Sequence, residues 1–176
     1  MSVNVLAYRS QTGATDKAGG TMRHEEVDED LRPLVFEFFF WFSRFESALK
    51  ESGWLQSKAV GAPARPDWQG FVLACAENYS PSVAARQLVA ANPLKQVIGE
   101  HGLTFADVVF ADRASQLERV TVLLKTVRNN LFHGGKQGGA YWDDPDRMRL
   151  LLPLSVTVLG ELVTLGGLEA DYTGYY

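Results

Sequence analysis

Five aliphatic residues between positions 117 and 131 constrain the fold more than any other feature of this sequence. They recur at alternating spacings of three and four residues: Leu117, Val120, Leu124, Val127 and Leu131. This spacing places all five side chains on one face of an α-helix, and that face must pack against partner helices. We expect the helix to begin near Asp112 and to reach His133, because Gly134 and Gly135 follow immediately.

A second long helix, expected from residue 30 or 31 to Gly53, is rich in aromatic residues. Its core stripe has helical spacing and comprises Phe38, Phe42, Phe45 and Leu49. Further aromatic residues fall partly on its other faces: Phe36, Phe39, Phe40 and Trp41. Two interpretations carry equal weight. Either the helix is buried deep within the domain, or its second face is a subunit interface.

Shorter helical patterns complete the chain, and no segment alternates polar and apolar residues over a convincing length. Helices are expected at 68–79, at 81–89, from Pro93 through Ile98, and at 147–165. Pro153 should kink or split the last of these helices. The acidic residues just before it, including Asp144, are expected to cap it. The sequence therefore predicts an all-α fold, an up-and-down bundle of four to five helices.

The composition fits one soluble domain. The chain has 176 residues, of which 46% are hydrophobic, so a single core can form. We expect a flexible N-terminal tail over 1–28, a helical domain over 29–168 and a C-terminal tail over 169–176.

Charge and cysteine content indicate a cytoplasmic protein. The net charge of −4 excludes nonspecific binding of nucleic acid through the overall charge of the protein. Residues 113–149 nevertheless contain seven basic and four acidic residues. The single cysteine suits a reducing compartment, and no signal peptide is apparent. The apolar run 34–42 is too short to span a bilayer, so no membrane association is expected. Three scattered histidines indicate neither a metal site nor a cofactor.

The end of the 112–133 helix gathers the residues that could carry chemistry. On a helical wheel Arg128 lies near the buried stripe, where its charge needs a carboxylate or a phosphate. Glu46 is the leading intramolecular partner, and a bound phosphate is the functional alternative. His133 shares a face with Asn129, four residues earlier, and the negative end of the helix dipole favours its protonated form.

An arginine, asparagines and a histidine at one helix end suit metal-free phosphoryl chemistry. Arg128 would hold a phosphate with two hydrogen bonds, and His133 would transfer protons. Further donors for phosphate or RNA are expected at Lys125, Asn130 and Lys136. On the residues alone, a structural histidine with a core arginine ion pair carries equal weight, because clusters of ionisable groups can be structural.

The segment from Arg128 to His133 resembles the Arg-x4–6-His signature of the HEPN superfamily, the higher eukaryotes and prokaryotes nucleotide-binding domains. Asn129 directly after the arginine and the Gly-Gly-Lys that follows His133 are also similar to that pattern. The aromatic helix, with Arg44-Phe45-Glu46, is similar to that of bacterial members. The resemblance covers roughly residues 34–165 and implies a helical bundle.

The resemblance also implies a function. Many HEPN proteins are metal-independent ribonucleases that act as homodimers in toxin–antitoxin or defence systems, and they leave 2′,3′-cyclic phosphate ends on RNA. By this resemblance, Arg128 would polarise the scissile phosphate, His133 would be the acid or base, and Asn129 would orient one of them. An antitoxin protein would be a possible partner. Toxin members regulated by nucleotide transfer carry a tyrosine where this chain has Gly135. Other members have lost catalysis and are nucleotide- or protein-binding modules, which is the alternative for this chain.

Overall fold

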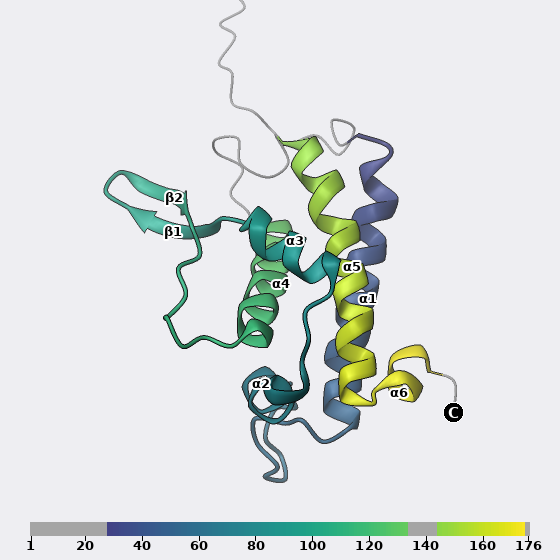
Figure 1. Ribbon diagram of the computed structural model, residues 1–176. Coiled ribbons are helices and arrows are strands. Elements are labelled where there is room, and N and C mark those ends of the chain that lie inside the picture. The colour runs from purple at the N-terminus through teal and green to yellow at the C-terminus, as the bar shows by residue number, and fades with distance from the viewer. Residues whose placement is uncertain (1–27, 134–143, 175–176) are drawn as a thin grey trace, which may run out of the picture.

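Three long helices form the body of the protein. The computed structural model describes residues 28–133 and 144–174. Within these residues the elements follow the order α1 (Leu31–Glu51), α2 (Trp68–Cys75), the 3-10 helix η2 (Ala76–Asn78), α3 (Val83–Ala91), β1 (Lys95–Gly99), β2 (Gly102–Ala106), α4 (Gln116–His133), α5 (Pro145–Gly166) and α6 (Glu169–Thr173). Figure 1 shows α1 and α5 running side by side in the same direction, with α4 running the opposite way.

The core lies where α1, α4 and α5 meet α2 and α3. The predicted seam of α4 is confirmed, because Leu117, Val120, Leu124 and Val127 are all at most 1% exposed. Leu131, the last of the five, packs against the core from its edge. The aromatic stripe of α1 is buried as predicted: Phe38, Phe42, Phe45 and Leu49. Helical periodicity thus located the faces that hold the domain together.

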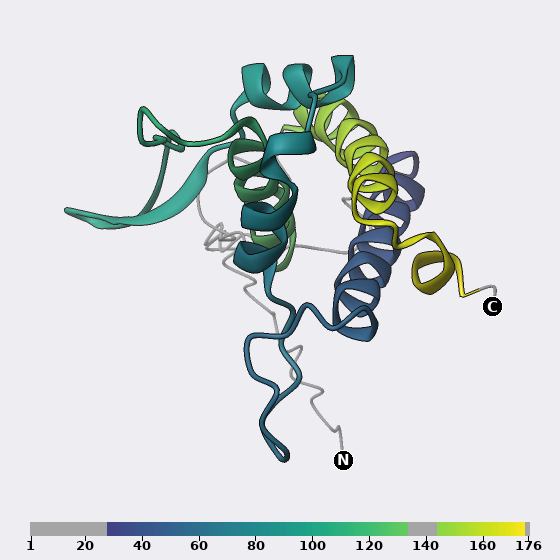
Figure 2. The ribbon, with the colours of Figure 1, turned by 60° about the horizontal axis from the view of Figure 1, so that its bottom comes forward.

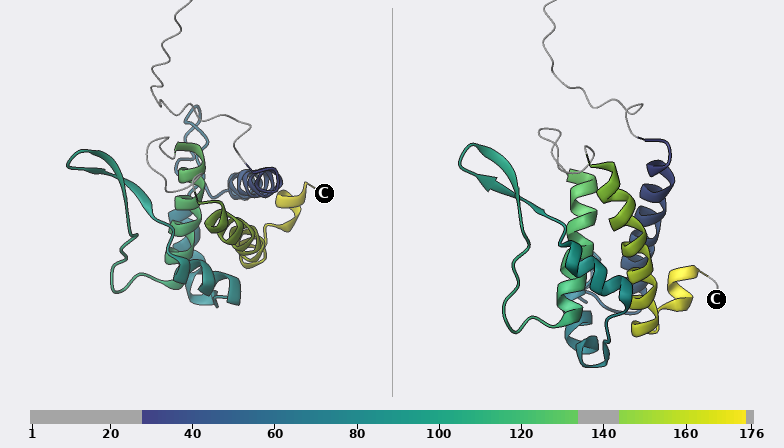
Figure 3. Two further views of the ribbon diagram at one scale, coloured as in Figure 1. Left: turned by 90° about the horizontal axis from the view of Figure 1, so that it is seen from above. Right: turned by 45° about the horizontal axis from the view of Figure 1, so that its top comes forward.

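The prediction of an all-α bundle of four to five helices is wrong. The described residues contain six α-helices and a two-stranded antiparallel sheet, in which Lys95 pairs with Ala106 and Gly99 with Gly102. The segment expected to be helical through Ile98 is therefore β1. Gly102 takes a φ of +122°, which favours glycine and permits the tight connection to β2. Figures 1 and 3 show that this hairpin projects from the α4 side of the molecule.

The C-terminal segment is also more structured than predicted. Residues expected to be a tail from 169 onward form α6, which packs against α1. Tyr172 is buried and stacks on Trp41 with 4.8 Å between ring centroids. Arg44 of α1 donates hydrogen bonds to the backbone carbonyls of Asp171 and Tyr172. Figure 2 shows α6 beside α1, on the side of the molecule away from the hairpin.

α5 is one continuous helix, although Pro153 lies inside it. Asp144 caps its N-terminus as predicted, because its Oδ1 accepts a hydrogen bond from the backbone N–H of Arg147 at 3.0 Å.

By length and composition alone α5 could cross a membrane. However, the core helix of a soluble protein passes the same test, and eight α5 residues are buried here. The predicted N-terminal tail lies outside the described residues except for Asp28, which forms an ion pair with Arg149.

Candidate functional site

Arg128 lies at the edge of the α4 core face, with its guanidinium resting on aromatic rings. Its Cζ is 4.8 Å from the ring centroid of Phe132 and 6.0 Å from that of Phe42. Its Nη1 donates a hydrogen bond to Asn129 Oδ1 at 3.1 Å. Within the described residues it forms no ion pair. The side chain is only half-buried, so cation–π contacts and partial hydration replace the carboxylate that the sequence suggested.

Glu46, the predicted partner of Arg128, makes a different contact. Its Oε1 accepts a hydrogen bond from the indole Nε1 of Trp68 at 3.0 Å. The same indole ring lies 5.6 Å from Nζ of Lys125. Burial lowers the pKa of the Lys125 ammonium, while the nearby Glu46 carboxylate opposes that shift. Glu46 therefore anchors Trp68 and partly balances Lys125, and no carboxylate of the described residues pairs with the Arg128 guanidinium.

A cleft of about 280 Å³ opens beside Arg128, and we call it the Arg128 cleft. It is lined by Phe42, Glu46, Gln56, Arg65, Pro66, Trp68, Lys125, Arg128 and Asn129. Three of these residues are cationic and one is acidic, so the cleft favours an anion. Arg65 and Gln56 come from the loop between α1 and α2. The backbone N–H of Gln56 donates to the carbonyl of Arg65 at 3.0 Å, which holds the two arms of that loop together.

The two asparagines of the motif have different surroundings. Asn129 is exposed, and its Oδ1 accepts the hydrogen bond from Arg128. Asn130 is 3% exposed, and its Nδ2 donates to the backbone carbonyl of Leu94 at 2.6 Å. This hydrogen bond joins α4 to the segment that leads into β1, and the binding of phosphate by Asn130 stays a prediction.

The remaining predicted residues lie at the limit of the described chain. α4 extends to His133, the last residue described before position 144, so His133 shares the helix end with Arg128. The prediction for Lys136 falls outside the described residues. Among the described residues, no group of three or more histidine, cysteine or acidic side chains is placed to hold a metal ion.

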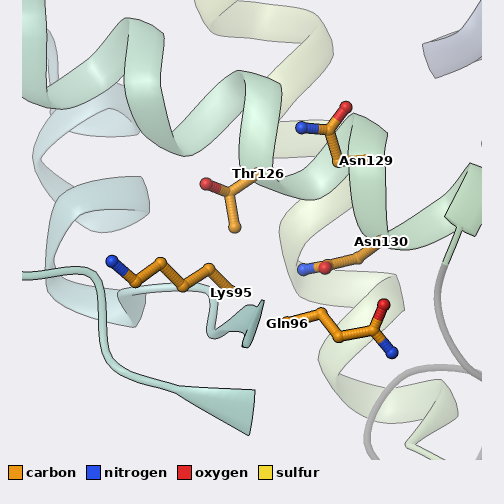
Figure 4. A pocket seen from close by; sticks show the side chains of 5 residues that line it. All are labelled: Lys95, Gln96, Thr126, Asn129 and Asn130. Carbon is orange, nitrogen blue, oxygen red and sulfur yellow. The ribbon is translucent and has the colours of Figure 1, made fainter. Parts of the chain in front are cut away.

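A second cleft of about 280 Å³ lies on the other side of Asn129, and we call it the hairpin pocket. Its lining comes from the start of β1 and the last turns of α4: Lys95, Gln96, Thr126, Asn129 and Asn130. Figure 4 shows Lys95 and Gln96 extending in opposite directions from β1. No sequence pattern associates them with the motif, because only the tertiary fold brings the hairpin to α4.

An exposed aromatic face adjoins the motif, formed by Phe36, Phe39, Phe40 and Phe132. Phe36 is 69% exposed, and the other three are between 42% and 46% exposed. The rings of Phe39 and Phe132 lie 4.8 Å apart, which joins α1 to the end of α4. Of the two interpretations of the aromatic helix, deep burial within the domain does not apply to this face.

Comparison of the chain with models of protein families, with curated proteins and with solved structures finds no match. The resemblance to the HEPN superfamily therefore rests on sequence features alone: the Arg128–His133 motif at the end of a long helix, its flanking residues, and the aromatic helix with Arg44-Phe45-Glu46.

Proposed function

We propose that this protein is a metal-independent endoribonuclease of the HEPN type that acts as a homodimer. The observation that carries the proposal is the position of the Arg128 guanidinium. It lines an open cleft with two other cations and has no carboxylate partner among the described residues. A phosphodiester is the ligand whose charge and geometry such a cleft suits.

The reaction follows from the residues at the end of α4. Arg128 would bind the scissile phosphate and stabilise the charge that develops on its oxygens. The RNA 2′-hydroxyl would attack the phosphorus, forming a P–O2′ bond while the P–O5′ bond breaks. One base must take the proton of the 2′-hydroxyl and one acid must protonate the leaving 5′-oxygen. His133 is the candidate for either step. Asn129, which hydrogen-bonds Arg128, would orient the guanidinium.

The aromatic face supports the homodimer. Four exposed phenylalanines, which form the ring pairs Phe36–Phe40 and Phe39–Phe132, are costly in water, and self-association would bury them. Because Phe132 belongs both to this face and to the stacking surface of Arg128, a two-fold interface here would bring two motifs close together. By its resemblance, such a dimer would act in the cytoplasm as a toxin or defence enzyme, and an antitoxin protein is a possible second partner.

The test compares single histidine variants on RNA in the presence of EDTA. The parent should cleave RNA and leave 2′,3′-cyclic phosphate ends. His133→Ala should lower the rate by about 100-fold or more, the usual contribution of a general acid or base. His101→Ala is the matched control, because His101 is exposed in the hairpin turn. Full activity of a folded His133→Ala variant would refute the proposal.

One observation favours the alternative, a non-catalytic nucleotide- or protein-binding module. Arg128 already has partners in the protein, because its guanidinium donates a hydrogen bond to Asn129 and lies over the rings of Phe132 and Phe42. If these contacts are purely structural, Arg128→Ala will lower the melting temperature, and the parent will not cleave RNA at any enzyme concentration.

A further inference from the structure

The hairpin pocket has a favourable electrostatic character for an anion. Lys95 is exposed at its rim and forms no ion pair within the described part of the chain. None of the five lining residues is acidic, and Asn129 presents an exposed amide, whereas the Thr126 hydroxyl already donates to the carbonyl of Val122. Asn129 Oδ1 already accepts a hydrogen bond from Arg128, so its amide nitrogen is the part that can donate to a ligand.

The pocket is held by three sets of hydrogen bonds, although it lies at the base of a projecting hairpin. Asn130 Nδ2 binds the carbonyl of Leu94, the residue before Lys95. Arg147 Nη2 donates to the carbonyls of Ala91 and Asn92 at 3.0 and 3.2 Å, which holds the end of α3 to α5. Asn92 Nδ2 donates a hydrogen bond to Asp107 Oδ1 at 3.3 Å, which joins the segments just before β1 and just after β2. A site fixed in this way loses little entropy when it binds a ligand.

The hairpin pocket and the Arg128 cleft are adjacent, because Asn129 lines both. An extended anionic ligand that fills one cleft would reach the other by crossing the exposed Asn129 side chain. A single-stranded RNA carries a charge at every nucleotide, and proteins that bind single strands follow the backbone with a row of cations. Lys125 and Arg128 on one side of Asn129 and Lys95 on the other form such a row.

We propose that the hairpin pocket binds the backbone phosphate that neighbours the phosphate held by Arg128 in a single-stranded RNA. Lys95 makes the ionic contact, and the amide nitrogen of Asn129 donates a hydrogen bond. The inference rests on the proposed function, because it needs an RNA strand in the Arg128 cleft. It adds a substrate contact from β1, an element outside the Arg-x4-His motif.

The test measures binding of single-stranded RNA oligonucleotides whose 2′-hydroxyls are methylated, so that they cannot be cleaved. Fluorescence anisotropy gives the affinity of the full-length chain over a range of salt concentrations. Lys95→Gln should weaken binding and reduce the slope of log K against log salt by about 0.7, the value for one lost phosphate contact on a single strand. The loss in affinity should therefore be about 2.6-fold larger at 50 mM than at 200 mM salt. Lys95→Arg should restore the parent slope.

Two comparisons separate this contact from other effects of charge. A dinucleotide with a single phosphate should bind the parent and Lys95→Gln equally well, because it cannot fill both clefts. Lys58→Gln removes the same charge from a cleft formed by other residues of the α1–α2 connection and should leave the slope unchanged.

The outcomes distinguish the two proposals. If the parent binds no RNA, both fail. If the parent binds RNA and Arg128→Gln weakens binding while Lys95→Gln does not, the proposed function stands and the role of the hairpin pocket is refuted. A Lys95→Gln variant that weakens binding with an unchanged salt slope also refutes it.

Discussion

A substitution of Asn130 tests which residues of the Arg128–His133 motif stabilise the fold and which bind a ligand. Its side chain is 3% exposed, and its amide nitrogen is 2.6 Å from the carbonyl oxygen of Leu94. Asn130→Ala removes this donor and leaves a carbonyl without its partner, which costs about 1–3 kcal/mol. We expect about 2 kcal/mol, because Leu94 is half-buried and water can partly satisfy its oxygen. The melting temperature should fall by about 4–8 °C.

The neighbouring Asn129 provides a matched control for this measurement. Asn129→Ala deletes the same amide from an exposed position, so it should change the free energy of unfolding by about 0.5 kcal/mol or less. Urea denaturation followed by circular dichroism gives both values, and the slope of unfolding free energy against urea should be the same in all three proteins. RNA binding should show the opposite order, because Asn129 lines both clefts.

One result would refute this reasoning. If Asn130→Ala is as stable as Asn129→Ala and yet loses RNA binding, then the Asn130 amide serves the ligand and its hydrogen bond to Leu94 adds nothing to stability.

Two further predictions follow from the aromatic face and from Lys125. The double variant Phe36→Ser, Phe40→Ser should sediment as a monomer where the parent sediments as a dimer. Leu73→Ser, at a residue that is 73% exposed outside this face, should leave the parent dimer intact. Burial lowers the pKa of Lys125, so the unfolded state binds that proton more tightly. Lys125→Met should therefore exceed the parent in stability at neutral pH. This advantage should shrink as pH rises toward the ordinary lysine pKa, and a pH-independent difference would contradict the assignment.

The sequence predicted the parts of the fold that depend on burial along one helix. The stripe of α1 and the seam of α4 repeat with the helical period, because each has one continuous buried face. The hairpin has no such face. Ile98 and Leu103 pair across the strands, yet they are 89% and 69% exposed. Each strand has only five residues, which is too short for a convincing alternation of polar and apolar residues.

α6 was missed because it depends on a partner far away in the chain. Its five residues are too few for a helical pattern, and an isolated helix of this length is unstable in water. Tyr172 gains its stability from Trp41, and the helix end is held by Arg44, both more than 120 residues earlier. Gly167, which takes a φ of +62° in the structure, is a local signal for the end of α5, but not for the helix that follows.

The candidate site was predictable only as far as it lies on α4. The spacing of Arg128 and His133 placed them at one helix end. Arg65, Gln56, Lys95 and Gln96 come from segments without periodicity, and tertiary contacts alone bring them to that end. The helical wheel placed Arg128 near the buried stripe, and the backbone of Arg128 does lie beside that stripe. Its long side chain nevertheless carries the guanidinium outward to the cleft, as arginines commonly do.

The geometry of one helical turn explains why Arg128, Asn129 and Asn130 differ in their surroundings. Consecutive residues of an α-helix are rotated by about 100°, so three in a row cover more than half of the circumference. Arg128 faces α1 and the aromatic rings, Asn130 faces the segment before β1, and Asn129 lies between them in the open. Because positions 129 and 130 are both asparagine, their order cannot explain this difference. The rotation of α4 against the core buries Asn130 and leaves Asn129 exposed, where it lines both clefts.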